Sequence, residues 1–251
     1  MMVKIIFLCI AGFISAFVDS IAGGGGIISV PAYLFAGIPP QFTLGTNKFS
    51  STAAAFTSSL NFAKSGKVNF ELMKYIAPFT FIGAAIGVHT VIKINQQYLY
   101  ILVLILILGV GIYSLFSKTI GVEDDFNGLN KKNIFYGIIL AFFLGFYDGF
   151  FGPGTGSFLM FGLIKIYGFD FVKGAGNARF LNFISNITAL LMFALYKRIY
   201  YIIGIPVAVS MIFGAKFGTA IALKKGSKLI KPIFVSMSLA VALKMLYNIV
   251  K

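Results

Sequence analysis

The chain has 251 residues, of which 59% are hydrophobic and only 11% are charged. Soluble domains carry about 25% charged residues, so this composition excludes a chain that covers its own core with polar surface. The formal net charge of +14 resides in Lys and Arg between long apolar runs. This pattern follows the positive-inside rule of membrane proteins and argues against a basic patch that binds nucleic acid.

Apolar runs of near-transmembrane length follow one another along the chain. In the first half they cover residues 5–21, 27–44, 46–62, 75–92 and 98–116. After a polar linker they cover residues 134–151, 156–172, 174–195, 200–222 and 229–249. A helix needs about 20 residues to cross the bilayer core, where every backbone polar group must be satisfied internally. We therefore predict an all-α polytopic membrane protein with a first membrane repeat (1–117), a linker (118–133) and a second membrane repeat (134–251).

The two halves share motifs in the same order. Asp19 lies four residues before the glycine cluster 23–26, and Asp148 lies four residues before the cluster 152–156. Residues 46–49 (TNKF) correspond to 176–180 (GNARF), and 83–87 (GAAIG) correspond to 214–218 (GAKFG). The offset stays between 129 and 131 residues throughout. These matches predict a duplication.

The second apolar segment of each half leaves two topologies open. If it crosses the membrane, each half has five crossings and the halves are inverted. If it dips in and returns, each half has four crossings and the halves are parallel. Five crossings place 12 Lys and Arg inside and 5 outside, whereas four crossings place 10 inside and 7 outside. Because basic loops stay in the cytoplasm, the counts favour inverted halves.

The N-terminal segment has a second interpretation. Lys4, the apolar run 5–18 and the small residues Ser20 and Ala22 resemble a signal peptide with its cleavage site. The same pattern recurs in the middle of the chain, where no signal peptidase would act. We therefore expect residues 5–21 to be a retained first helix.

Five charged residues lie well inside apolar segments: Asp19, Lys48, Asp148, Arg179 and Lys216. Such charges cost about 2.5–3.5 kcal/mol each at a helix centre on insertion scales, so they mark candidate functional sites. Structural ion pairing or snorkelling is the alternative, and it is strongest for Lys216. The other four fall in the duplicated motifs.

The glycine clusters predict broken helices. Glycine lets the backbone leave helical geometry, and a helix that restarts afterwards presents N–H groups that favour anions. Two broken helices from an inverted repeat form the substrate site of many secondary transporters. The alternative role, close helix packing, is favoured for the glycines of 83–87 and 214–218.

These considerations give a candidate substrate-binding set and a candidate proton-coupling pair. The substrate-binding candidates are Gly23, Gly24, Gly25, Gly26, Asn47, Lys48, Gly152, Gly154, Thr155, Gly156, Asn177 and Arg179. Asp19 and Asp148 are the proton-coupling candidates, because burial disfavours the charged form of a carboxylate. We expect Lys48 to face the substrate, with pairing to Asp19 as the alternative. Arg179 follows Asn177 by two residues whereas Lys48 follows Asn47 by one, a shift of about 100° on a helix.

The motifs resemble the sulfite exporter TauE/SafE family, also called the toluene sulfonate uptake permeases. The segments that carry the resemblance are VDSIAGGGGIISVPA, LGTNK, GFYDGFFGPGTGSF and NARFLNFISN, and the match covers essentially the whole chain. It is strongest to the large bacterial branch named only as probable membrane transporters. The resemblance implies duplicated membrane halves and transport of sulfur-containing or organic anions such as sulfite, sulfonates and thiosulfate.

We therefore expect a multi-pass secondary transporter for a small anion in the cytoplasmic membrane, with proton coupling. An uncoupled anion channel is the first alternative. A membrane-embedded enzyme is disfavoured by the single Cys (Cys9) and the single His (His89), which also speak against a metal site or another cofactor. GPGTGSF lacks the Lys-Ser/Thr of a nucleotide-binding loop. The expected partners are the anion and the lipid bilayer, not nucleic acid, and the sequence leaves the oligomeric state open.

Overall fold

The computed structural model describes residues 2–95, 97–99, 124–126 and 128–225. Its long and short helices are α1 (Met2–Ala22), α2 (Gly26–Phe35), α3 (Pro40–Lys64), α4 (Phe70–Ile92), α6 (Lys131–Phe150), α7 (Thr155–Tyr167), α8 (Phe171–Leu195) and α9 (Tyr201–Lys225). The predicted segments 98–116 and 229–249 lie outside the described residues, apart from 98 and 99. Over the described part, the all-α prediction is confirmed.

Five of these helices are long and apolar enough to cross a membrane: α1, α4, α6, α8 and α9. Helix α3 has 25 residues but is more polar, because it carries two lysines and many Ser, Thr and Asn residues. Fourteen of its residues are buried. The polar helix therefore lies inside the bundle, where the more apolar helices cover it.

The two glycine clusters reverse the direction of the chain. Gly23 and Gly24 have φ angles of 81° and 86°, and Gly152 and Gly154 have φ angles of 100° and 84°. This left-handed region is accessible to glycine at little cost, whereas a Cβ atom disfavours it. The broken helices predicted at the clusters are confirmed.

The short helices α2 and α7 run back along the helices that precede them. Lys4 Nζ, near the start of α1, donates a hydrogen bond to the Ala36 carbonyl at the end of α2 (3.1 Å). Similarly, the Tyr167 hydroxyl at the end of α7 donates to the Asn133 carbonyl at the start of α6 (3.0 Å). Each pair is therefore a helical hairpin whose two ends lie at the same end of the bundle.

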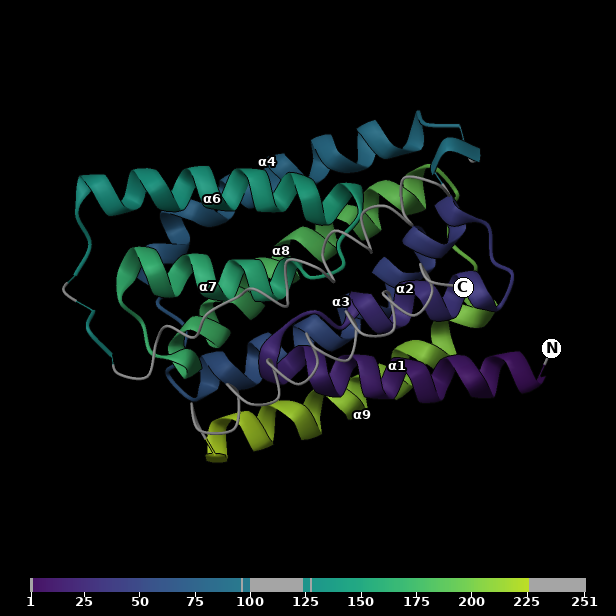
Figure 1. The fold of residues 1–251 in the computed structure, drawn as a ribbon, viewed down its shortest axis with the longest axis horizontal. Coiled ribbons are helices and arrows are strands. Elements are labelled where there is room, and N and C mark those ends of the chain that lie inside the picture. The colour runs from purple at the N-terminus through teal and green to yellow at the C-terminus, as the bar shows by residue number, and fades with distance from the viewer. Residues whose placement is uncertain (1, 96, 100–123, 127, 226–251) are drawn as a thin grey trace, which may run out of the picture.

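The hairpin has the direction that the five-crossing topology gives to the second segment of each half, which returns to the side where the first segment began. Helices α2 and α7 have 10 and 13 residues, fewer than the about 20 that a full crossing needs, so the choice between five and four crossings stays a prediction. In Figure 1, α1 runs from right to left and α6 from left to right.

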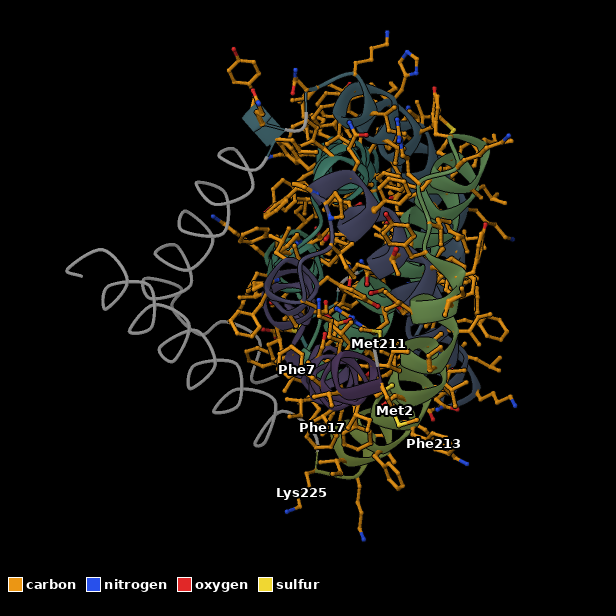
Figure 2. All side chains as sticks on the ribbon, turned by 90° about the vertical axis from the view of Figure 1, so that its right-hand side faces the viewer. Met2, Phe7, Phe17, Met211, Phe213 and Lys225 are labelled. Atoms are coloured by element: carbon orange, nitrogen blue, oxygen red, sulfur yellow. The ribbon has the colours of Figure 1, made fainter. Side chains whose placement is uncertain are left out.

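The two halves pack against each other through their helices. Among the described helices, the most extensive contacts join α4 of the first half to α6 of the second, and α9 of the second half to α1 of the first. Figure 2, viewed along the long axis of the bundle, shows α1 and α9 side by side. A Cβ atom on Gly83 would lie 2.2 Å from the Phe142 carbonyl oxygen, and one on Gly214 would lie 2.3 Å from that of Phe13. The close-packing role expected for these glycines is confirmed.

The described turns gather at two ends of the bundle. At one end, the backbone N–H of Asp125 donates to the Gly168 carbonyl (2.8 Å), so the linker contacts the α7–α8 turn. At the other end, the Tyr200 N–H donates to Thr46 Oγ1 (3.0 Å). The linker end, on the left of Figure 1, holds the end of α3, the starts of α4, α6 and α8 and the ends of α7 and α9. The described basic residues near these helix ends are Lys64, Lys67, Lys74, Lys131, Lys132, Lys165, Lys173, Lys224 and Lys225. The opposite end carries Lys4, Lys93, Lys197 and Arg198.

Candidate functional site

The helix bounds align the two intramembrane cations. Helices α3 (Pro40–Lys64) and α8 (Phe171–Leu195) have 25 residues each and start 131 residues apart. At this offset Lys48 corresponds to Arg179, whereas Asn47 corresponds to Ala178. The asparagines are therefore the residues that differ in register, and the two cations occupy equivalent places.

Lys48 pairs with the carboxylate of the other half. Its Nζ lies 2.9 Å from Asp148 Oδ2, and the two side chains are 4% and 2% exposed. Ser185 Oγ also donates to Asp148 Oδ2, and Asn182 Nδ2 lies 3.4 Å from the same oxygen. Asp148 is therefore enclosed by donors from α3 and α8. The alternative that paired Lys48 with Asp19 is wrong.

Arg179 forms the reciprocal pair. Its Nη1 donates to Asp19 Oδ2, and the Gly25 N–H donates to Asp19 Oδ1 at 2.8 Å. The Arg179 side chain is 2% exposed, whereas that of Asp19 is 25% exposed. Each pair thus joins a cation of one half to a carboxylate of the other.

Asn182 lies between the two pairs. Its Oδ1 is 3.5 Å from Arg179 Nη1 and its Nδ2 is 3.4 Å from Asp148 Oδ2. We call Asp19, Lys48, Asp148 and Arg179 the central charge cluster. Two cations and two carboxylates balance formally, which is how a membrane interior tolerates four charges.

The tips of the two hairpins meet beside this cluster. A Cβ atom on Gly23 would lie 2.3 Å from the Ser157 backbone nitrogen, and one on Gly26 would lie 2.9 Å from Pro153 Cα. The Ser157 hydroxyl donates to the Ala22 carbonyl across the same contact (3.1 Å). Only glycine allows the N-termini of α2 and α7 to come this close. Both helices then direct positive dipole ends toward the centre of the bundle.

Part of Arg179 has no partner. Its Nη2 is buried and makes no hydrogen bond within the described residues. A Cβ atom on Gly156 would lie 1.8 Å from this nitrogen, so the guanidinium rests against the first turn of α7. The backbone N–H groups of Gly26 and Gly156 also make no hydrogen bond in the described part of the chain. Unpaired donors of this kind can bind an anion.

Three other predicted site residues make local contacts. Thr155 Oγ1 donates to the Gly152 carbonyl (2.7 Å) and closes the α6–α7 turn. Asn177 Oδ1 accepts from the Asn69 N–H (2.8 Å), which ties α8 to the start of α4. Asn47 is 6% exposed, and its Oδ1 lies 3.5 Å from Ser51 Oγ. The structure therefore brings together the charged candidates and the glycine clusters, while Asn177 binds the backbone at the start of α4.

Sequence reasoning missed Asn182 and Ser185. They follow Arg179 by three and six residues on α8, so all three can share one helix face. A search for neutral polar residues at helical spacing from each buried charge would have found them. Lys216, the fifth intramembrane charge, is exposed on α9 and lies outside the cluster. No group of three His, Cys, Asp or Glu residues that could hold a metal ion occurs within the described residues.

Comparison with known proteins agrees with the resemblance seen in the motifs. The family model described as sulfite exporter TauE/SafE matches residues 8–245. A probable membrane transporter protein of Haemophilus influenzae is 37% identical over 97% of this chain and 94% of its own length. A probable membrane transporter protein of Sinorhizobium sp is 36% identical over 96% of this chain and 91% of its own length. The probable membrane transporter protein YfcA of Escherichia coli is 33% identical over 96% of this chain and 89% of its own length. No solved structure matches the chain. The protein is thus a multi-pass membrane transporter that belongs to the sulfite exporter TauE/SafE family.

Proposed function

We propose that the protein is a secondary transporter that moves a small anion across the cytoplasmic membrane. The observation that carries the proposal is the buried Arg179 Nη2, which has no hydrogen-bond partner among the described residues and lies against the N-terminus of α7. A buried guanidinium nitrogen without an acceptor is costly, and a bound oxyanion relieves that cost. The two facing helix N-termini favour negative charge at the same place.

The arrangement of the helices supports alternating access by two inverted halves. Helices α1 and α6 run in opposite directions in Figure 1, and the cation–carboxylate pairs link the halves reciprocally. Paired broken helices meeting at a repeat interface are the usual substrate site of inverted-repeat transporters. The Lys-rich linker end is then cytoplasmic, because short cytoplasmic loops are enriched in Lys and Arg.

The family description supports a sulfur oxyanion or a sulfonate as the substrate class. Sulfur oxyanions and sulfonates carry the oxygen atoms that an arginine and backbone N–H groups bind. Asp19 and Asp148 are the carboxylates through which a proton gradient could drive transport, since no nucleotide-binding loop is present in the sequence. We propose proton-coupled movement of such an anion.

Flux into liposomes tests this function. The purified protein should take up methanesulfonate or thiosulfate with saturable kinetics, and an inward proton gradient should accelerate uptake. Arg179→Met should abolish uptake, whereas Lys216→Met removes an exposed cation of the same membrane region and should leave it unchanged. Non-saturable flux that ignores the gradient would instead indicate a channel. Full uptake by Arg179→Met would remove the proposed site.

A further inference from the structure

We infer that Asp19 competes with the transported anion for Arg179, so that the carboxylate acts as a built-in substitute for substrate. This inference rests on the proposed function and divides the roles of the two aspartates. In the structure, Arg179 Nη1 donates to the Asp19 carboxylate. The arriving anion takes its place.

The two carboxylates differ in their surroundings. The Asp148 carboxylate accepts from the side chains of Lys48, Ser185 and Asn182, and its side chain is 2% exposed. The Asp19 carboxylate accepts from Arg179 and from one backbone N–H, and its side chain is 25% exposed. Asp148 is therefore enclosed within a set of side-chain donors, whereas Asp19 is the carboxylate that can leave its partner.

Arg179 is only half used. Nη1 donates to Asp19, while Nη2, beside Gly156, has no partner in the part of the chain that the structure describes. A guanidinium binds an oxyanion best through two parallel N–H···O bonds. An anion that binds Nη1 and Nη2 in parallel meets the Asp19 carboxylate at Nη1. Two negative groups also repel each other there, so binding of the anion releases the carboxylate.

Release of Asp19 from Arg179 explains how transport of the anion can be coupled to a proton. A carboxylate that loses its cation inside a low-dielectric bundle takes up a proton from water, which neutralises it. Of the charged side chains on the described helices packed against α1, only Arg179 on α8 contacts Asp19. Lys48 on α3 is held by Asp148 of α6, Lys216 on α9 is exposed, and Lys224 and Lys225 lie at the end of α9. The anion therefore enters with one proton, and its affinity rises as the pH falls.

Asp148 has a different role in this scheme. It keeps Lys48, and through Asn182 it borders Arg179 Nη1. It is a positioning residue that holds the halves together and stays paired with Lys48 throughout the transport cycle.

Calorimetric binding of methanesulfonate tests the division of roles. This probe stays ionised across the neutral and mildly acidic range, so any pH dependence belongs to the protein. Wild-type protein should bind more tightly at lower pH, by up to about tenfold per unit for one proton. Asp19→Asn should bind about tenfold to a hundredfold more tightly at neutral pH, because a competing charge-assisted bond is gone, and should lose the pH dependence. Asp148→Asn should keep the pH dependence.

Arg179→Met separates failure of the inference from failure of the function. If wild type binds and Arg179→Met does not, but Asp19→Asn shows no gain in affinity, the competition is wrong and the anion site stands. If Arg179→Met binds as wild type does, or no form binds, the proposed function fails and the inference with it. Should Asp19→Asn be unstable, the rise in its melting temperature with added methanesulfonate reports the same affinity. A rise no larger than that of wild type overturns the competition.

Discussion

The Lys48–Asp148 pair offers a stability test with a defined magnitude. Both side chains are almost fully buried, and the two atoms that join them are 2.9 Å apart. Removing one partner leaves an uncompensated charge in the bundle, which costs about 3–5 kcal/mol. Asp148→Asn also weakens the acceptor of Ser185 and Asn182, and Lys48→Met leaves the carboxylate without its cation. We expect each single variant to lose stability in this range.

The double variant distinguishes pairing from independent effects. Lys48→Met with Asp148→Asn leaves neither charge behind, so it should cost no more than either single variant, with a coupling energy of roughly 3 kcal/mol. Unfolding by sodium dodecyl sulfate in mixed micelles, followed by circular dichroism, measures these differences. Lys216→Met, an exposed cation on α9, is the control and should change stability by less than about 0.5 kcal/mol. Single costs that simply add in the double variant would refute the pairing.

Three further predictions concern packing, the site and topology. Gly156→Ala would place a methyl group 1.8 Å from the buried guanidinium, so methanesulfonate binding should fall at least about tenfold in calorimetry. Gly83→Ala would place a methyl carbon 2.2 Å from the Phe142 carbonyl oxygen of α6 and should lower the free energy of unfolding by about 1–3 kcal/mol in the micelle assay. In a Cys9→Ser background, Lys197→Cys should react with an impermeant thiol reagent in whole cells and Gly66→Cys should not; labelling of both would overturn the assigned orientation.

The sequence predicted the ingredients of the site better than their connections. The Asp–glycine spacing repeated at a constant offset, and membrane insertion cost singled out the buried charges. Neither signal says which cation meets which carboxylate, because that depends on how the helices of the two halves pack. Lys48 lies on α3 and its partner Asp148 on α6, exactly one hundred residues later in the chain.

The bounds of the short helices were harder to predict for a different reason. Hydropathy treats residues 27–44 as one apolar run, yet α2 ends at Phe35 and α3 begins at Pro40. The reversal comes from the φ angles of Gly23 and Gly24, which composition alone does not show. Asn177 illustrates the converse, since a residue in a duplicated motif serves the start of α4 through Asn69.

The packing of α4 on α6 and of α1 on α9 has a consequence for biogenesis. Helix α4 is synthesised before α6 and α1 long before α9, so the glycine faces of the first half stay uncovered until the second half has been inserted. If the two halves were separate chains, assembly through the same contacts would depend on their concentration. Within one chain the association is unimolecular. The linker thus supplies each half with its partner at a fixed ratio and a high effective concentration.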